Sequence, residues 1–239
     1  MPPPIDPATP PMQLLARFGP ESEPAPAPSL EESMAYVRGL SSSHYENFHV
    51  LSSLVPVDLR DDFAAVYAFC RWADDLGDET GDTDEARARS LSLLGWWRQQ
   101  LQGCFAWAMR SDGNSPIAQG VDQGSSPTPR VEPNGPTHPV FIALAETVRR
   151  HGSGGGEHQS GGAGPLTITP FDRLIQAFEL DQTLHHYQTW DQLLHYCTLS
   201  ADPVGRIVLA LAGYADTPEN AQLYAMSDAT CTALQLTNH

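Results

Sequence analysis

The chain has 239 residues, and its 13 Lys and Arg against 29 Asp and Glu give a formal net charge of −16. This balance argues against a nucleic-acid binder, which needs basic side chains to neutralise phosphates, and it disfavours an electrostatic membrane anchor. The four cysteines are far apart and form no CxxC pair, so we expect neither a zinc ribbon nor a disulfide framework but a reduced, cytoplasmic setting.

Membrane signals are weak throughout the sequence. No stretch approaches the ~20 apolar residues of a membrane span, and the N-terminus lacks the apolar region of a signal peptide. We therefore expect a cytoplasmic protein. A peripheral membrane contact stays open as an option.

Three segments are dominated by Gly, Ser, Pro and polar residues. They are a Pro/Ala-rich tail at 1–29 and low-complexity insertions at 111–137 and 153–167. Such composition cannot build a packed core, so we expect these segments to lack regular structure. The remainder, 30–239, is predicted to form one domain.

Every ordered segment is predicted to be helical. Ser29 and Glu32 form a capping-box pattern at the first helix, Thr169 and Pro170 begin another, and basic residues followed by Gly152 end a third. Alternation typical of strands is absent, so the fold class is predicted to be all-α. The predicted helices span 29–40, 58–78, 84–109, 138–152, 169–184, 189–214 with an interruption at Pro203, and 217–238.

Acidic residues continue the apolar face of the helix predicted over 58–78. With Phe63 at zero and roughly 100° per residue, the apolar stripe of this helix includes Asp74 at about 20° and Asp78 at about 60°. Asp75 and Glu79 fall further away, at about 120° and about 160° on the same count. Two carboxylates one turn apart are thus predicted to face the interior.

A divalent cation would relieve the cost of burying these two carboxylates. Mg²⁺ prefers oxygen ligands and is commonly shared between carboxylates and substrate phosphates, and it would let an acidic protein hold a diphosphate. A helix end that emerges into solvent explains the same pattern equally well. The histidine spacings, His44 with His49 and His185 with His186, do not place two imidazoles on one helical face, so a zinc site is not expected.

Three segments together resemble the squalene/phytoene synthase family. They are "HYENFHVLSSLVPVDLRDDFAAVYAFCRWADDLGDE" at 44–79, "YQTWDQLLHYCTLSADPVGRIVLALAGY" at 187–214 and "ALQLTN" at 233–238. The opening of the first segment and "SADPVGR" in the second are most similar to the hydroxysqualene synthase branch. The resemblance implies a single-domain isoprenoid-synthase-type helical bundle around a central cavity.

The same resemblance implies Mg²⁺-dependent chemistry on prenyl diphosphates. In this branch presqualene diphosphate loses diphosphate and water captures the cation to give hydroxysqualene. Head-to-head condensation of two farnesyl or geranylgeranyl diphosphates, as in a squalene or phytoene synthase, stays open as an alternative.

Residue roles also follow from the resemblance. It assigns Mg²⁺ to Asp74 and Asp78, and it places Tyr67, Arg71 and Tyr196 around the reacting diphosphate. From the residues alone, Tyr196 and Phe48 are most simply explained as core aromatics. The resemblance implies substrate contacts for His44, Tyr45, Phe48, Val204, Gly205, Gln235 and Asn238.

The resemblance also implies a second aspartate-rich helix one turn beyond Asn238, where the printed sequence has only His239. We therefore expect the bundle to be incomplete at its C-terminus and these 239 residues alone to show negligible synthase activity. A catalytically inactive fragment of such an enzyme is the second alternative.

Overall fold

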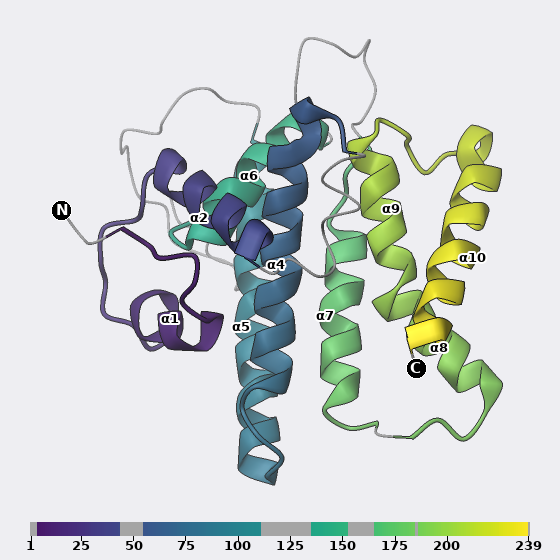
Figure 1. The fold of residues 1–239 in the computed structure, drawn as a ribbon, viewed down its shortest axis with the longest axis horizontal. Coiled ribbons are helices and arrows are strands. Elements are labelled where there is room, and N and C mark those ends of the chain that lie inside the picture. The colour runs from purple at the N-terminus through teal and green to yellow at the C-terminus, as the bar shows by residue number, and fades with distance from the viewer. Residues whose placement is uncertain (1–3, 44–54, 111–134, 153–164, 185, 239) are drawn as a thin grey trace, which may run out of the picture.

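The protein is a bundle of helices in the computed structural model, which describes residues 4–43, 55–110, 135–152, 165–184 and 186–238 (Figure 1). These residues contain no strand, only an isolated bridge between Gly152 and Leu166, and the all-α prediction is confirmed. The helices are α1 (Pro11–Phe18), α2 (Leu30–Ser43), α4 (Arg60–Asp78), α5 (Asp84–Ala108), α6 (Pro139–His151), α7 (Thr169–Asp181), α8 (Trp190–Ser200), α9 (Asp202–Leu211) and α10 (Ala221–Asn238), with 3₁₀ turns at Val57–Leu59 and Pro218–Asn220.

Short polar side chains fix where several helices begin. Before α2, the Ser29 backbone N–H donates to Glu32 Oε2 at 2.8 Å and the Glu32 N–H donates to Ser29 Oγ at 3.2 Å, which confirms the predicted capping box. Thr83 and Thr189 accept hydrogen bonds in the same way at the starts of α5 and α8.

The predicted interruption in the 189–214 segment lies between α8 and α9. Ala201 separates the two helices with φ −111° and ψ −55°, and Pro203 lies in the first turn of α9. Proline lacks an N–H and is tolerated in the first turn of a helix but not in its interior. The chain therefore changes direction between α8 and α9, and both helices pack against α7.

Helix α4 lies at the centre of the bundle, with α2, α5 and α6 packed on one side and α7 on the other (Figure 1). The predicted apolar stripe, which contains Phe63 and Tyr67, is only half-buried. The fully buried face lies on the opposite side of the helix, at roughly 180–240° from Phe63. A central helix has two apolar faces, and its core face consists of Ala65, Phe69, Trp72 and Leu76.

The prediction that 1–29 lacks regular structure is wrong, because α1 forms within it. Leu14 joins the hydrophobic core, and Met12, Leu15 and Phe18 pack against that core. Pro11 occupies the first turn, where its missing N–H costs nothing. The Pro/Ala-rich flanks conceal this short amphipathic helix in the overall composition.

The two predicted insertions fall largely outside the described residues. The described parts, 135–137 and 165–167, contain no helix or strand. Leu166 is nevertheless fully buried in the core, and its N–H donates to the His151 carbonyl at 2.9 Å. Within the part of the chain that the structure describes, no helix has the length and apolar character needed to cross a bilayer.

Candidate functional site

A pocket of about 290 Å³ opens between α4, α7, α8 and α10. Residues from four helices contribute to it, and carboxylates lie on two of these helices, α4 and α7. The lining contains no Lys, Arg or His side chain. The lining residues are Asp74, Asp78, Leu174, Ala177, Phe178, Asp181, Tyr196, Ser200 and Gln235.

Two of the pocket carboxylates come from the last turns of α4. Asp74 and Asp78 are one turn apart and both face the pocket, at the helix end where the dipole disfavours negative charge. Burial raises the pKa of both carboxyl groups above the ordinary value, although Arg71 lowers each. The mutual repulsion of the carboxylates adds to the increase at Asp74.

Arg71 and Asp75 form an ion pair beside the pocket. Arg71 Nη2 lies 2.6 Å from Asp75 Oδ1, and its Nη1 lies 3.4 Å from Asp74 Oδ2. Asp75 is only 2% exposed, and burial raises its pKa to about 6 despite Arg71. The expectation that Asp75 would lie further from the interior than Asp74 and Asp78 is therefore wrong, since the core face of α4 is the one opposite the predicted stripe.

The other side of the pocket is built from the end of α7 and from α8. The Tyr196 hydroxyl donates to Asp181 Oδ2 at 3.0 Å, and the Tyr187 ring lies 5.4 Å from the Tyr196 ring, centroid to centroid. Burial first, and then the negative charge of Asp181, raise the pKa of Tyr196 well above that of a free phenol. Tyr196 is therefore a neutral phenol at physiological pH.

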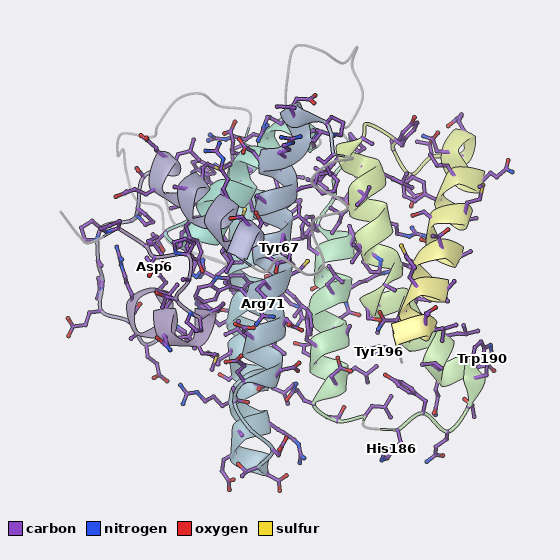
Figure 2. All side chains as sticks on the ribbon, viewed as in Figure 1. Asp6, Tyr67, Arg71, His186, Trp190 and Tyr196 are labelled. Carbon is purple, nitrogen blue, oxygen red and sulfur yellow. The ribbon has the colours of Figure 1, made fainter. Side chains whose placement is uncertain are left out.

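Four of the residues singled out from the sequence line this one pocket, namely Asp74, Asp78, Tyr196 and Gln235. Arg71 reaches Asp74 from one turn earlier on α4, and Tyr67 lies one further turn back on the same helix (Figure 2). The predicted positions His44, Tyr45 and Phe48, together with the Asn238 side chain, lie outside the described residues.

Val204 and Gly205 are not among the residues that line the pocket. Val204 is 44% exposed on α9. Gly205 faces α10, where an added Cβ would lie within 2.7 Å of Cys231 Sγ and even closer to Ser227 Oγ. The close approach that requires glycine here is therefore between two helices.

Sequence reasoning missed Asp181, Ser200 and Asp75. Asp181 ends α7, whose last turn carries no basic residue, so an acid stands at the negative end of a helix dipole. That mismatch is a signal visible once the helix end is known. Ser200 gives no comparable signal, because only the tertiary fold brings it to the pocket.

The donor set fits a hydrated divalent cation better than a metal held by protein alone. No three His, Cys, Asp or Glu side chains among the described residues converge closely enough to hold a metal by themselves. Within the described part of the chain, Oδ2 of Asp75 and Nε of Arg71 are buried and have no hydrogen-bond partner. Mg²⁺ keeps several waters and takes phosphate oxygens, so two carboxylates suffice on the protein side.

Comparison with known proteins places these features in one family. The family model described as squalene/phytoene synthase matches residues 41–239. The hydroxysqualene synthase of Zymomonas mobilis is 31% identical over 194 residues, which are 81% of this chain and 49% of that protein. The phytoene synthase of Arthrospira platensis is 26% identical over 185 residues, which are 77% of this chain and 46% of that protein.

A solved structure extends the similarity to three dimensions. The crystal structure of squalene synthase HpnC from Alicyclobacillus acidocaldarius matches with a TM-score of 0.63 and 36% sequence identity, covering 88% of this chain and 61% of that one. The chain spans about half the length of the curated relatives that it matches. The predicted helical bundle of the isoprenoid-synthase type is thereby confirmed.

Proposed function

Because the chain belongs to the squalene/phytoene synthase family, we propose that its pocket binds the diphosphate of a prenyl diphosphate together with Mg²⁺. The reaction we propose converts presqualene diphosphate to hydroxysqualene. The carbon–oxygen bond to diphosphate breaks, diphosphate leaves with the bonding electrons, and water adds its oxygen to the carbocation and loses a proton. The name of the Zymomonas mobilis relative supports this choice.

The observation that carries the proposal is the charge around the pocket. Asp74, Asp78 and Asp181 line it without a lining basic side chain, in a chain of net charge −16. A diphosphate cannot approach such a surface unless cations intervene. Asp74 and Asp78 would hold Mg²⁺, which when bound supplies the positive charge that stabilises the leaving diphosphate.

Other side chains have roles that follow from their positions. Arg71, held by Asp75 next to Asp74, can donate to a diphosphate oxygen, with Tyr67 on the same helix. Tyr196 offers a neutral aromatic surface to the reacting carbon, and Gln235 offers an amide from α10. Val204 and Gly205 retain a proposed role near the isoprenoid tail, although they do not line this pocket.

Head-to-head condensation is a second candidate reaction for the same site. The relative named phytoene synthase and the solved structure titled squalene synthase favour it. Two farnesyl or geranylgeranyl diphosphates would then be the substrates. The two candidates share the diphosphate site and differ in the product.

Product analysis tests the reaction. The full open reading frame that contains these residues is expressed and incubated with Mg²⁺ and either presqualene diphosphate or farnesyl diphosphate, and the lipids are identified by mass spectrometry. We expect hydroxysqualene from presqualene diphosphate, with Asp74→Asn lowering the rate by at least about ten-fold because a charged oxygen ligand is lost. Squalene or phytoene as the product supports the second candidate, and absence of any Mg²⁺-dependent product contradicts both.

A further inference from the structure

Asp181 is placed where electrostatics disfavours it. It is the last residue of α7, and the last turn of that helix has no basic side chain to offset the dipole. It also shares the pocket with Asp74 and Asp78. A carboxylate at this position raises the free energy of the pocket when no ligand is bound. The contacts that Asp181 makes therefore indicate its role.

Asp181 contacts Tyr196, which comes from the next helix. The Tyr196 hydroxyl donates to Asp181 Oδ2 at 3.0 Å, and the tyrosine is only 8% exposed. A hydrogen bond to a charged acceptor is stronger than one between neutral groups. The contact therefore fixes the direction of the Tyr196 phenol more firmly than packing alone would.

This contact also sets which part of the tyrosine meets the pocket. A phenol has one O–H, and here it is used by Asp181. The O–H is therefore directed at Asp181, and the Tyr196 side chain lines the pocket in that orientation. Ser200, one turn later on α8, donates from its hydroxyl to the Tyr196 carbonyl at 3.1 Å and lines the same pocket.

We propose that Asp181 is a positioning residue, whose carboxylate fixes the orientation in which the Tyr196 side chain lines the pocket, beside the isoprenoid carbon next to the diphosphate. This inference rests on the proposed function of the pocket. Asp181 acts through Tyr196 and not by contact with the ligand. The alternative is that the same hydrogen bond only ties α7 to α8.

A double-mutant cycle separates these two roles. The probe is farnesyl thiodiphosphate, an analogue that resists ionisation, titrated calorimetrically in MgCl₂ into purified residues 1–239. The variants are Asp181→Ala, Asp181→Asn, Tyr196→Phe and the double variant Asp181→Ala with Tyr196→Phe. Thermal midpoints are recorded for all of them.

We expect Asp181→Ala and Tyr196→Phe each to weaken binding about ten-fold, in line with loss of one charged hydrogen bond. The affinity of the double variant should equal that of the single variant that binds less tightly, within about two-fold. Both substitutions remove the same hydrogen bond, so their effects should not add. Asp181→Asn should recover most of the affinity, since its amide oxygen still accepts the phenol hydrogen bond. The inference is overturned if the single variants have a lower thermal midpoint but an unchanged affinity for the analogue. It is also overturned if the fold-losses in affinity of the two single variants multiply in the double variant.

A spectroscopic readout covers the case in which Asp181→Ala fails to fold. The protein is labelled with 3-fluorotyrosine, and the Tyr196 resonance is assigned by its absence in Tyr196→Phe. In Asp181→Asn the resonance should shift, because a neutral acceptor replaces a charged one, and an unmoved resonance contradicts the inference. If the unsubstituted chain does not bind the analogue in Mg²⁺, the proposed function itself fails, whereas binding that is insensitive to Asp181 refutes only the positioning role.

Discussion

Three aspartates within five residues of α4 have different surroundings. Asp75 is buried against Arg71 at 2.6 Å, whereas Asp74 and Asp78 line the pocket. Helical geometry separates neighbouring residues by roughly 100°, so adjacent acids face different environments. Asp75 therefore orients Arg71, and the other two are available to a cation.

Removing the Asp75 carboxylate should destabilise the fold. In Asp75→Ala, Arg71 loses its closest partner at a largely buried position, and we expect a loss of about 1–2 kcal/mol in the free energy of unfolding, because Arg71 retains some solvent exposure. Urea titration followed by circular dichroism measures this. The exposed Asp82→Ala should change the value by less than about 0.5 kcal/mol. Equal stability of the two variants would show that the ion pair does not support α4.

At the scale of elements, contacts between helices explain why packing requires glycine at one helix position and not at another. Gly205 on α9 meets Ser227 and Cys231 of α10, whereas a Cβ at Gly95 on α5 would have no atom within 4 Å. Glycine in a helix interior is otherwise unfavourable by roughly 0.5–1 kcal/mol relative to alanine. One glycine is thus required by packing and the other is not.

The two glycines give a matched pair of substitutions. Gly205→Ala should lower the free energy of unfolding by about 1–3 kcal/mol because Ser227 and Cys231 must move. Gly95→Ala should raise it by about 0.5–1 kcal/mol through helix propensity. Chemical denaturation of both variants tests the pair, and a stabilised Gly205→Ala would contradict the close α9–α10 contact.

His138 at the start of α6 links stability to pH. Its Nδ1 accepts the Val140 N–H at 3.3 Å, and its ring meets those of Trp72 and Trp97 edge-on at centroid distances of 4.4 Å and 5.0 Å. Complete burial lowers the pKa of His138 to about 3. The folded state therefore keeps this imidazole neutral at pH values where the unfolded chain protonates it.

Stability should consequently fall as the pH drops below about 6.5. Between that pH and about 3 the unfolded state binds a proton that the folded state does not. By pH 5, His138 alone should therefore lower the free energy of unfolding by about 2 kcal/mol. His138→Asn keeps a capping side chain but has no imidazole, so its unfolding free energy should depend less on pH over this window. Urea titrations at pH 5 and pH 7 check this, and identical pH dependence in both proteins would refute the buried neutral imidazole.

The sequence predicted where the helices lie better than it predicted which face of a helix is buried. The cap at Ser29 and the break near Pro203 are local signals, so the start of α2 and the division between α8 and α9 could be predicted from them. The short helix at Pro11–Phe18 was missed because its flanks are rich in proline. The core face of α4 was misassigned because a central helix is apolar on both sides, and periodicity does not show which side neighbours fill.

At the scale of the whole molecule, the pocket depends on contacts between residues far apart in sequence. Asp74 and Asp78 from α4 meet Asp181 from α7, Tyr196 from α8 and Gln235 from α10. The family resemblance named four of these five residues. The sequence analysis did not include Asp181, because its place in the pocket arises from the packing of α7 against α4 and α8.

The central claim is that this acidic pocket binds a diphosphate only through a divalent cation. The most direct measurement is calorimetric titration of farnesyl thiodiphosphate into residues 1–239 with and without MgCl₂, for the unsubstituted chain, for Asp74→Asn and for Asp84→Asn, which makes the same charge change at a side chain that is 96% exposed. We predict binding that requires Mg²⁺, is weakened at least about ten-fold by Asp74→Asn and is unchanged by Asp84→Asn. Binding without Mg²⁺, or equal affinity of the Asp74→Asn and Asp84→Asn variants, would contradict the account.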